Sequence, residues 1–475
     1  MKIIYVFILL IEFSLEEIGK GNNTNNTVIN RNKKKYNATK IINSSKVENI
    51  ESIEKINTKK VNLTKKRSHF EDCSDSFDCK KDFVCKLNRC FTKFEFSNLK
   101  ILGLSDKNLC DKDKPCQSDK KCIKHRCVKN ENEIDLPRKK KRNDTSVNLL
   151  FAGSIFLNGM AYESGVMKNG SFNYDHLFKN IKKIIKKADL AVVDQETVFQ
   201  TNKTNFIKAV RNTPTELGDA IAKAGFKLIL HGTLYAFSKE SKGIINTLNF
   251  WRNKYPNIHV LGISKDSEKS DNDYYIYKKN NIKIGIINFS GFRNLIPKDK
   301  EHFVNVIYKE KIKKIIGKLY NKTDFIIACM NWGEKNSSLP QINQVYYAKD
   351  LVENGVKLII GNHPSSVHPI TYIKSKGKTA LVFWSLGHLV SDSKRKFSYL
   401  GALANITISK RKKKAFISNY NLIPIINHKI NTTDYSVYKL SEYSQELGLK
   451  AYSNFSMENV TKECKRVMGD FINVE

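Results

Sequence analysis

The sequence predicts an α/β fold from Val147 onward, with helices covering the faces of a sheet. Apolar runs of strand length recur along this part of the chain, and amphipathic stretches of helical period lie between several of them. With 475 residues and 40% hydrophobic side chains, the chain can also build a sizeable core. Together these three observations indicate one large α/β domain with additional segments before it.

The strands are predicted from short apolar runs, of which VNLLFAG at 147–153 is the first. The later runs lie at 189–193, 226–230, 258–261, 282–289, 324–330, 356–360 and 380–384. The stretch 174–188 is predicted as one helix, because its apolar residues fall on one face with lysines opposite. Those apolar residues are Leu177, Ile181, Ile184 and Ile185. Further helices are predicted at 213–224 and 242–254, and a polar tail with short helical potential at 428–475.

The chain begins with a pattern typical of a secretory signal. Lys2 precedes an apolar run from Ile3 to Ile11, roughly half the ~20 residues that a membrane span needs. We assign residues 1–18 to a signal peptide, with an uncleaved signal anchor as the alternative, and expect a secreted or cell-surface protein. Residues 19–70 are predicted to be disordered, because their few apolar side chains cannot offset the entropy of ordering.

Residues 71–128 contain two copies of a four-cysteine repeat. Both copies follow C-x5-C-x5-C-x4-C, and each ends in a basic residue just before its last cysteine. The eight cysteines are Cys73, Cys79, Cys85, Cys90, Cys110, Cys116, Cys122 and Cys127. Units this short cannot hold together by burial alone, so we predict two disulfide bridges in each, with three connectivities open. A zinc site is the alternative, although zinc sites usually have tighter C-x2–4-C pairs.

A basic linker is predicted at 129–146, and it carries the run RKKKR at 138–142. We interpret the run as a solvated hinge; a protease processing site or a contact with an anionic surface, including a peripheral membrane contact, is the alternative. The whole chain has 82 Lys and Arg against 47 Asp and Glu, a formal charge of +35. That charge suits an anionic partner, or it reflects a composition rich in Lys and Asn throughout. No motif of the common nucleic-acid modules is present, so nucleic acid is not an expected partner.

Several motifs recur in a fixed order between residues 147 and 427. They are DLAVVDQET (189–197), GFKLILHGTLY (225–235), MNWGEK (330–335), ENGVKLIIGNHPSSVHP (353–369) and FWSLGHLV (383–390). With the opening strand that ends at Gly153, and with Gly243 and Thr247, this order resembles the CapA family of capsule synthesis proteins (PGA_cap), named for poly-γ-glutamate. The resemblance implies a calcineurin-like metallophosphatase fold: a sandwich of two sheets flanked by helices, with ligands at the carboxyl ends of strands.

Most positions that hold metal ions in that family carry other residues in this chain. Where the family has its first Asp, this chain has Ser154, and where the family reads Asn-Leu-Glu it has Asp194-Gln195-Glu196. The family's Asn-Asn-His is replaced by Thr233-Leu234-Tyr235. Two family His positions carry Asn331 and Ser365, and a family Asn position carries His388. Glu196 and His363 are retained. A two-metal site needs carboxylate, amide and imidazole ligands that converge from several strands, so its loss is expected.

We therefore expect a catalytically degenerate CapA-like protein that binds a ligand or partner and needs no cofactor. An extracellular protein or an anionic polymer is the expected partner, and a membrane is contacted only through an uncleaved signal or basic residues. One alternative is a hydrolase with a remodelled site, whose catalytic candidates are Asp194, Glu196, His363 and His388. Its metal, if one binds, would be divalent, with candidate ligands Asp194, Glu196, Asn331 and His363. The other alternative is a role with a polyglutamate-like polymer outside the cell.

Overall fold

A computed structural model describes part of the chain. The described residues are 83–86, 89–92, 121–123, 126–128, 141, 143–200, 213–265, 273–292, 296–335, 337–393 and 397–468. The predicted signal (1–18) and the predicted disordered arm (19–70) lie outside them. No helix within the described ranges is both long and apolar enough to cross a membrane.

Each cysteine repeat contributes one antiparallel hairpin. Strand β1 (Phe83–Lys86) pairs with β2 (Arg89–Thr92), and β3 (Lys121–Ile123) pairs with β4 (Arg126–Val128). The register places Cys85 opposite Cys90 and Cys122 opposite Cys127, so the third and fourth cysteines face each other in both copies. The predicted bridges involve side chains outside the described part of the structure, and they stay a prediction.

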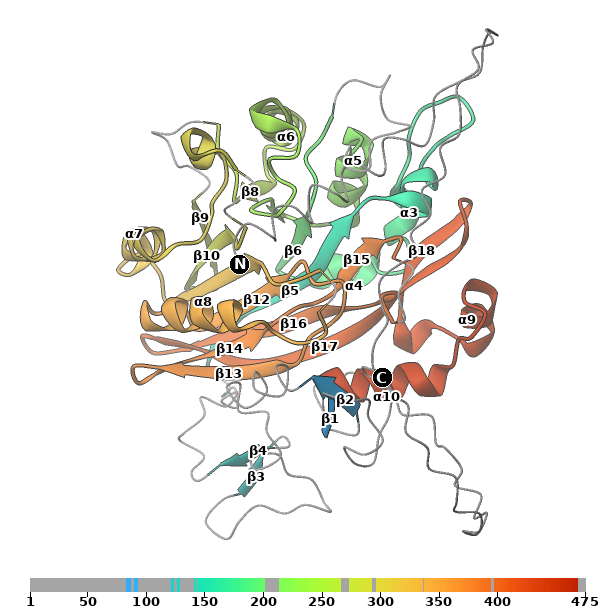
Figure 1. The fold of residues 1–475 in the computed structure, drawn as a ribbon. Coiled ribbons are helices and arrows are strands. Elements are labelled where there is room, and N and C mark those ends of the chain that lie inside the picture. The colour runs from blue at the N-terminus through green and yellow to red at the C-terminus, as the bar shows by residue number, and fades with distance from the viewer. Residues whose placement is uncertain are drawn as a thin grey trace, which may run out of the picture. The chain divides into compact units, whose positions relative to one another are not determined.

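The large domain contains two sheets (Figure 1). The larger sheet has the order β18-β17-β16-β5-β6-β7-β8, with β15 on β5, and the smaller has the order β13-β14-β12-β11-β10-β9. The larger sheet consists of β5 (Thr145–Phe156), β6 (Leu190–Gln195), β7 (Leu228–Leu230), β8 (His259–Leu261), β15 (His388–Ser391), β16 (Leu400–Arg411), β17 (Lys414–Asn431) and β18 (Asp434–Lys439). The smaller consists of β9 (Tyr274–Lys279), β10 (Ile282–Ser290), β11 (Phe325–Asn331), β12 (Leu358–Asn362), β13 (Ile370–Ser375) and β14 (Lys378–Phe383). Strands β5 to β8, and likewise β10, β11, β12 and β14, run parallel, so their carboxyl ends share one edge.

Alternating side chains of the strands form three apolar layers. In β5, Leu149 and Phe151 face the core between the two sheets, whereas Leu150 and Ala152 face the helices. Helices α5 (Thr215–Ala224) and α6 (Glu240–Lys254) cover the larger sheet, and α7 (Lys309–Leu319) and α8 (Ile342–Glu353) cover the smaller one (Figure 1). The predicted α/β fold, with two sheets flanked by helices, is confirmed.

The helix predicted at 174–188 is two shorter pieces. A 3₁₀ helix spans Asp175–Phe178, and α4 spans Lys182–Lys187. Both Leu177 and Phe178 are buried, although neighbouring residues of an α-helix point about 100° apart. The chain turns between these two pieces, and both side chains reach the core. The predicted apolar face was correct, and the predicted continuity was wrong.

The segment predicted as a polar tail from residue 428 belongs to the domain. The predicted boundary at Asn427 falls inside β17, and β18 pairs with that strand. Helix α9 spans Gln445–Ala451, and α10 (Met457–Met468) buries Val460, Cys464 and Val467 in the core that lies between the sheets. Apolar residues spaced three or four apart are enough to dock a helix, even where the average composition is polar.

Candidate functional site

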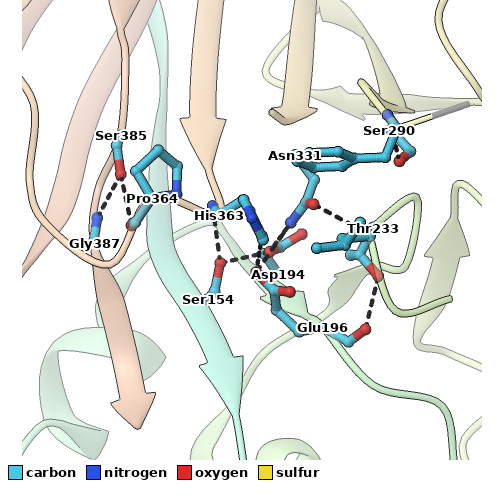
Figure 2. Close-up of polar contacts among 12 residues, drawn as sticks. Ser154, Asp194, Glu196, Thr233, Ser290, Asn331, His363, Pro364, Ser385 and Gly387 are labelled. Atoms are coloured by element: carbon cyan, nitrogen blue, oxygen red, sulfur yellow. Dashed lines mark hydrogen bonds and ion pairs between the residues drawn. The ribbon is translucent and has the colours of Figure 1, made fainter. Parts of the chain in front are cut away.

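Five polar side chains meet where parallel strands end. Ser154 lies in β5, opposite Asp194 of β6, and Glu196 directly follows β6. Asn331 ends β11, and His363 follows β12. Because the carboxyl ends of parallel strands share an edge, residues far apart in the sequence converge there. We refer to these five residues as the polar centre, and Figure 2 shows their side chains directed toward one another.

Direct hydrogen bonds connect the polar centre. The Ser154 hydroxyl donates to Asp194 Oδ2 at 2.7 Å. The Asn331 amide, through Nδ2, donates to Asp194 Oδ2 at 3.0 Å and to Glu196 Oε1 at 3.3 Å. His363 Nδ1 donates to Glu196 Oε1 at 3.2 Å. One chain of contacts thus runs from Ser154 to His363 (Figure 2).

Burial makes the charges of the two carboxyl groups interdependent. Asp194 and Glu196 are each 1% exposed. Burial, followed by repulsion from Glu196, raises the pKa of Asp194 well above its usual value. Burial also acts to raise the pKa of Glu196, but the attraction and hydrogen bond of His363 outweigh it and leave that pKa lowered. The two pKa values are thus shifted in opposite directions, so Asp194 keeps its proton to a higher pH than Glu196 does.

The backbone holds His363 in an uncommon conformation. Its φ is +93°, in the left-handed region that residues other than glycine rarely adopt. Its backbone N–H donates to the Ser154 hydroxyl at 3.4 Å. Its ring lies edge-on to Phe292, with centroids 4.7 Å apart, and 6.4 Å from the ring of Tyr235. These contacts fix the imidazole against Glu196, as expected where a strained residue serves a site.

His388 lies beside the polar centre without bonding to it. In the larger sheet it is paired with Ser154, and it is 2% exposed. Burial lowers its pKa to about 4 despite the attraction of Glu196, so its ring is neutral at neutral pH. Its Nδ1 atom is buried and has no hydrogen-bond partner among the described residues. Of the four predicted catalytic candidates, three are linked by hydrogen bonds and His388 is their neighbour.

The donor atoms do not fit the two-metal site that the resemblance implies. The metal-binding atom of an amide is its oxygen, but Asn331 Oδ1 accepts a hydrogen bond from the backbone N–H of Leu234 at 3.0 Å. The amide nitrogen, which cannot bind a metal, faces both carboxyl groups instead. Ser154 supplies a neutral hydroxyl where a carboxylate is needed. In the described ranges no three His, Cys, Asp or Glu side chains are placed to hold an ion.

Another set of residues holds together the backbone around the site. A Cβ atom at Gly153 would lie 2.3 Å from the carbonyl oxygen of Gly387, and one at Gly361 would lie 2.1 Å from that of Trp384. The indole N–H of Trp332 donates to the same Trp384 oxygen at 3.1 Å. These residues belong to the motifs that match the family pattern. They are needed for close backbone contacts whether or not the site is catalytic.

The loop after β14 is joined to the His363 turn in the same way. The Ser385 hydroxyl donates to the carbonyl oxygen of Pro364 at 3.2 Å and accepts from the backbone N–H of Gly387 at 3.1 Å (Figure 2). The backbone N–H of Leu386 donates to the carbonyl oxygen of Gly361 at 3.1 Å. The motif Ser385-Leu386-Gly387 therefore holds the end of β12 and the turn that carries His363.

Three residues at the site were not singled out from the sequence. Asn288 lies in β10, where its side chain accepts from the backbone N–H of Gly232 at 2.7 Å and orders the loop after β7. Phe292 packs on His363. The Lys335 ammonium lies 4.9 Å from the centre of the Phe156 ring. Lys335 could have been recognised from the sequence, because the motif NWGEK has Lys where the family has Glu.

Two mixed sheets flanked by helices, with a polar centre at the carboxyl ends of their parallel strands, define the class of this domain as a two-sheet α/β fold. The chain belongs to the family described as "Bacterial capsule synthesis protein PGA_cap", whose model matches residues 148–393. The resemblance to CapA proteins predicted from the sequence is confirmed.

Two relatives carry the same family name. The PGA biosynthesis protein CapA of Bacillus subtilis (strain 168) is 22% identical over 274 residues, which cover 55% of this chain and 67% of that protein. The capsule biosynthesis protein CapA of Bacillus anthracis is 21% identical over 264 residues, which cover 53% of this chain and 62% of that protein. The matches thus span about two thirds of each relative.

Similar solved structures include phosphatases. A novel phosphatase from Mycoplasma pneumoniae has a TM-score of 0.35 at 14% identity, over 60% of this chain and 94% of that one. The calcineurin-like phosphoesterase YfkN from Bacillus subtilis has a TM-score of 0.36 at 15% identity, over 68% of this chain and 99% of that one. The family of this chain is shown by the PGA_cap model that matches residues 148–393.

Proposed function

We propose that this chain is a secreted or surface CapA-like protein that has lost metal-dependent phosphoesterase chemistry and acts by binding. The observation that carries the proposal is the position of the Asn331 amide between Asp194 and Glu196. A neutral donor occupies the position where the family chemistry requires a cation. Apart from Glu196 and His363, the retained family residues are those that close backbone contacts need.

The charge balance of the polar centre supports this proposal. A two-metal site brings together several ionised carboxylates, and bound cations offset their repulsion. Here burial favours the neutral form of Asp194, and the charge of Glu196 is balanced by a hydrogen bond from His363 and by the Asn331 amide. The centre therefore satisfies its own charges by direct contacts, and a cation is not required to hold it together.

Two buried acceptor atoms indicate what kind of ligand the centre would take. Glu196 Oε2 and His388 Nδ1 make no hydrogen bond to any described residue. Glu196 Oε2 accepts hydrogen bonds when that carboxyl group is ionised, and Nδ1 of neutral His388 accepts in the tautomer that carries its proton on Nε2. In that state a ligand that reaches both atoms donates hydrogen bonds, as an amine, an amide or a hydroxyl group does. Such a ligand would enter past Leu234, Tyr235 and Phe292, which are all partly exposed.

Residues 1–128 support the proposed location and partners. The signal-like start and the clustered cysteines suit an oxidising compartment outside the cytosol. The two hairpins, expected to be closed by disulfide bridges, are candidates for contacts with an extracellular protein. The names of the two CapA relatives are consistent with a role at a cell surface.

Metal content and turnover of the full chain test the proposal. We expect the secreted protein, incubated with Mn²⁺ or Zn²⁺ and desalted, to retain far less than one ion per chain and to hydrolyse no phosphoester above background. A variant with Ser154→Asp, Leu234→Asn and Tyr235→His restores three family ligands and should gain metal. Adding Glu196→Gln to that variant removes a retained family ligand; it is the matched control, and it should lose the gain. Stoichiometric metal or chelator-sensitive turnover in the unaltered chain would overturn the proposal.

A metal-free hydrolase is a second candidate, favoured by the contact between Glu196 and His363. A carboxylate that accepts from one nitrogen of an imidazole leaves the other nitrogen available as a general base. Glu196→Gln and His363→Asn should then each abolish an activity found by screening esters, while His388→Asn retains it. Asn suits the positive φ at position 363. If no ester class is turned over, this candidate fails.

A further inference from the structure

Three hairpins meet at the end of the domain opposite to the polar centre. They join β9 to β10, β13 to β14 and β16 to β17, at residues 278–283, 374–378 and 410–414. The Lys410 ammonium donates to the backbone oxygen of Asn281 at 3.0 Å, so the first and third hairpins are in contact. A pocket of about 60 Å³ is lined by residues of β14 and β17, which brings the second beside them. We refer to these three segments together as the basic end.

The sequence of the basic end contains no acidic residue. Its segments read KKNNIK, KSKGK and KRKKK. Loops at the carboxyl ends of the strands mix the two signs instead, as KDKE at 298–301 and EK at 334–335 show. The absence of acidic residues is therefore a feature of these hairpins and not of every loop in this lysine-rich chain.

Neighbouring carboxylates neutralise only part of this charge. Four of them lie beside the basic end, each 2.6–3.0 Å from one basic side chain. The pairs are Asp144 with Arg411, Asp189 with Lys279, Asp324 with Lys410, and Glu353 with Lys376. The exposed lysines that have no carboxylate partner among the described residues are Lys278, Lys283, Lys374, Lys412, Lys413 and Lys414. Their ammonium groups attract an anionic partner.

A second basic region continues this end across the larger sheet. It is a cavity of about 480 Å³ where β6 and β7 begin, lined by Asp189 and by four lysines, Lys182, Lys186, Lys223 and Lys227. We refer to it as the lysine cavity. Asp189 connects it to the β9–β10 hairpin, because its carboxylate accepts from Lys279 Nζ at 2.6 Å. Positive charge thus extends over one end of both sheets.

The form of this end favours a broad anionic surface over a single anionic group. The unpaired lysines stand on separate hairpins and do not follow one groove. Lysine is a compact, hydrated point charge, whereas the planar fork of arginine suits bidentate binding of one phosphate or carboxylate. Arg411 is the one arginine in the three segments, and it is already bound to Asp144 through two nitrogens. A membrane with anionic headgroups presents negative charge in this diffuse form.

Two further features fit a membrane at this end. The chain enters the domain here, because Thr145 of β5 pairs with Lys410, and the basic run RKKKR at 138–142 comes shortly before. Tyr320 is 68% exposed and lies four residues before Asp324. Tyrosine, with an apolar ring and a polar hydroxyl, is enriched where a membrane meets water.

We propose that the basic end docks on a membrane surface that carries anionic lipids. The unpaired lysines contact the headgroups, and Tyr320 enters the interfacial layer. Since the polar centre lies at the opposite ends of the strands, docking directs it away from the lipid. The docking surface is apart from the polar centre, and its role holds whether that centre binds a ligand or catalyses a reaction.

Sedimentation of the full chain with vesicles tests the charge requirement. We expect binding to phosphatidylcholine vesicles that contain about 30% phosphatidylglycerol, little binding to phosphatidylcholine alone, and release in high salt. The variant Lys412→Gln/Lys413→Gln/Lys414→Gln should bind at least about tenfold more weakly, because each lysine near an anionic surface strengthens binding roughly fivefold.

The matched control removes the same charge from exposed positions of α7. We expect Lys309→Gln/Lys313→Gln/Lys314→Gln to change binding by less than about threefold, because salt screens charges that stay away from the surface. An equal loss in the two triple variants, or equal binding to neutral vesicles, would overturn the docking surface.

A tryptophan probe tests which part of the domain contacts the lipid. The native tryptophans Trp251, Trp332 and Trp384 are at most 1% exposed, so Tyr320→Trp adds an exposed fluorophore. Brominated lipids in anionic vesicles should quench it, and they should not quench Tyr346→Trp, at a 61% exposed position of α8. Equal quenching at the two positions, or none at position 320, would contradict docking by the basic end. Binding to heparin without quenching on vesicles would assign this end to a soluble polyanion instead of a membrane.

Discussion

The two ends of strand β6 differ in the sign of their charge and in their access to water. At the carboxyl end, Asp194 and Glu196 are 1% exposed and are connected by hydrogen bonds to Ser154, Asn331 and His363. At the amino end, exposed lysines surround an open cavity and most of them lack a carboxylate partner in the described residues.

The difference follows from the local dielectric. Unbalanced charge inside a protein is costly, so at the buried end each carboxyl group is either protonated or hydrogen-bonded. Water and salt screen charges at the exposed end, so several lysines can stand together at little cost. Substitutions at the buried end should therefore change stability strongly, whereas substitutions at the exposed end should change it little.

The largest effect is expected from Asn331→Ala. The change removes the donor shared by the two carboxyl groups and leaves them facing each other in a buried site. We expect a loss of about 3 kcal/mol in the free energy of unfolding at neutral pH, measured by urea denaturation. Asn249→Ala, on the exposed face of α6, is the control and should change stability by less than about 0.5 kcal/mol. A loss below about 1 kcal/mol at position 331 would contradict the account of the polar centre.

Opposite effects are expected from Glu196→Gln and Asp194→Asn. The lowered pKa of Glu196 adds stability above its usual pKa of 4.5, and that stability is lost as the pH falls. Glu196→Gln should therefore cost about 2 kcal/mol at neutral pH, with a smaller difference in acid.

The raised pKa of Asp194 has the reverse sign. Its contribution to stability is present below its usual pKa of 3.8, and it is lost as the pH rises through its value in the folded state. Asp194→Asn keeps the acceptor for Ser154 and should stabilise the protein by about 1 kcal/mol at neutral pH. Unfolding curves from acid to neutral pH measure both variants. If both substitutions changed the free energy of unfolding in the same direction near neutral pH, the two pKa values would not be shifted in opposite directions.

A smaller effect is expected from Asp189→Asn at the amino end of β6. The change removes the ion pair with Lys279, whose side chains are 44% and 25% exposed, and weakens the hydrogen bond from Asn148. Because solvent screens this pair, we expect a loss of about 1 kcal/mol, measured by urea denaturation. A loss as large as that of Asn331→Ala would remove the contrast between the two ends.

The smallest effect on stability is expected from Lys186→Gln/Lys227→Gln. Both side chains are exposed, so the free energy of unfolding should change by less than about 0.5 kcal/mol. Thermal unfolding with and without added salt measures this. A larger loss, removed by salt, would mean that these lysines support the fold through charge interactions.

Local patterns predicted much of this domain. Apolar runs located the strands of the two parallel regions to within a few residues, since a buried strand must be apolar wherever it lies. The strands β16, β17 and β18 were not singled out, and the helix at 174–188 was predicted as continuous. In these segments packing against neighbouring strands and helices decided where each element begins and ends, and local sequence preference did not.

The sequence by itself determined which family ligands are replaced, because Ser154, Leu234 and Tyr235 can be recognised from their place in a motif. Only the tertiary structure decided what the replacements do. Asn331 and Asp194 are 137 positions apart, and His363 and Glu196 are 167 apart. Their contacts depend on strand order and register, which no local pattern encodes. The same is true of the lysine cavity, where α4, α5 and the start of β7 meet. The sequence supplies the chemical groups, and packing decides which of them are in contact.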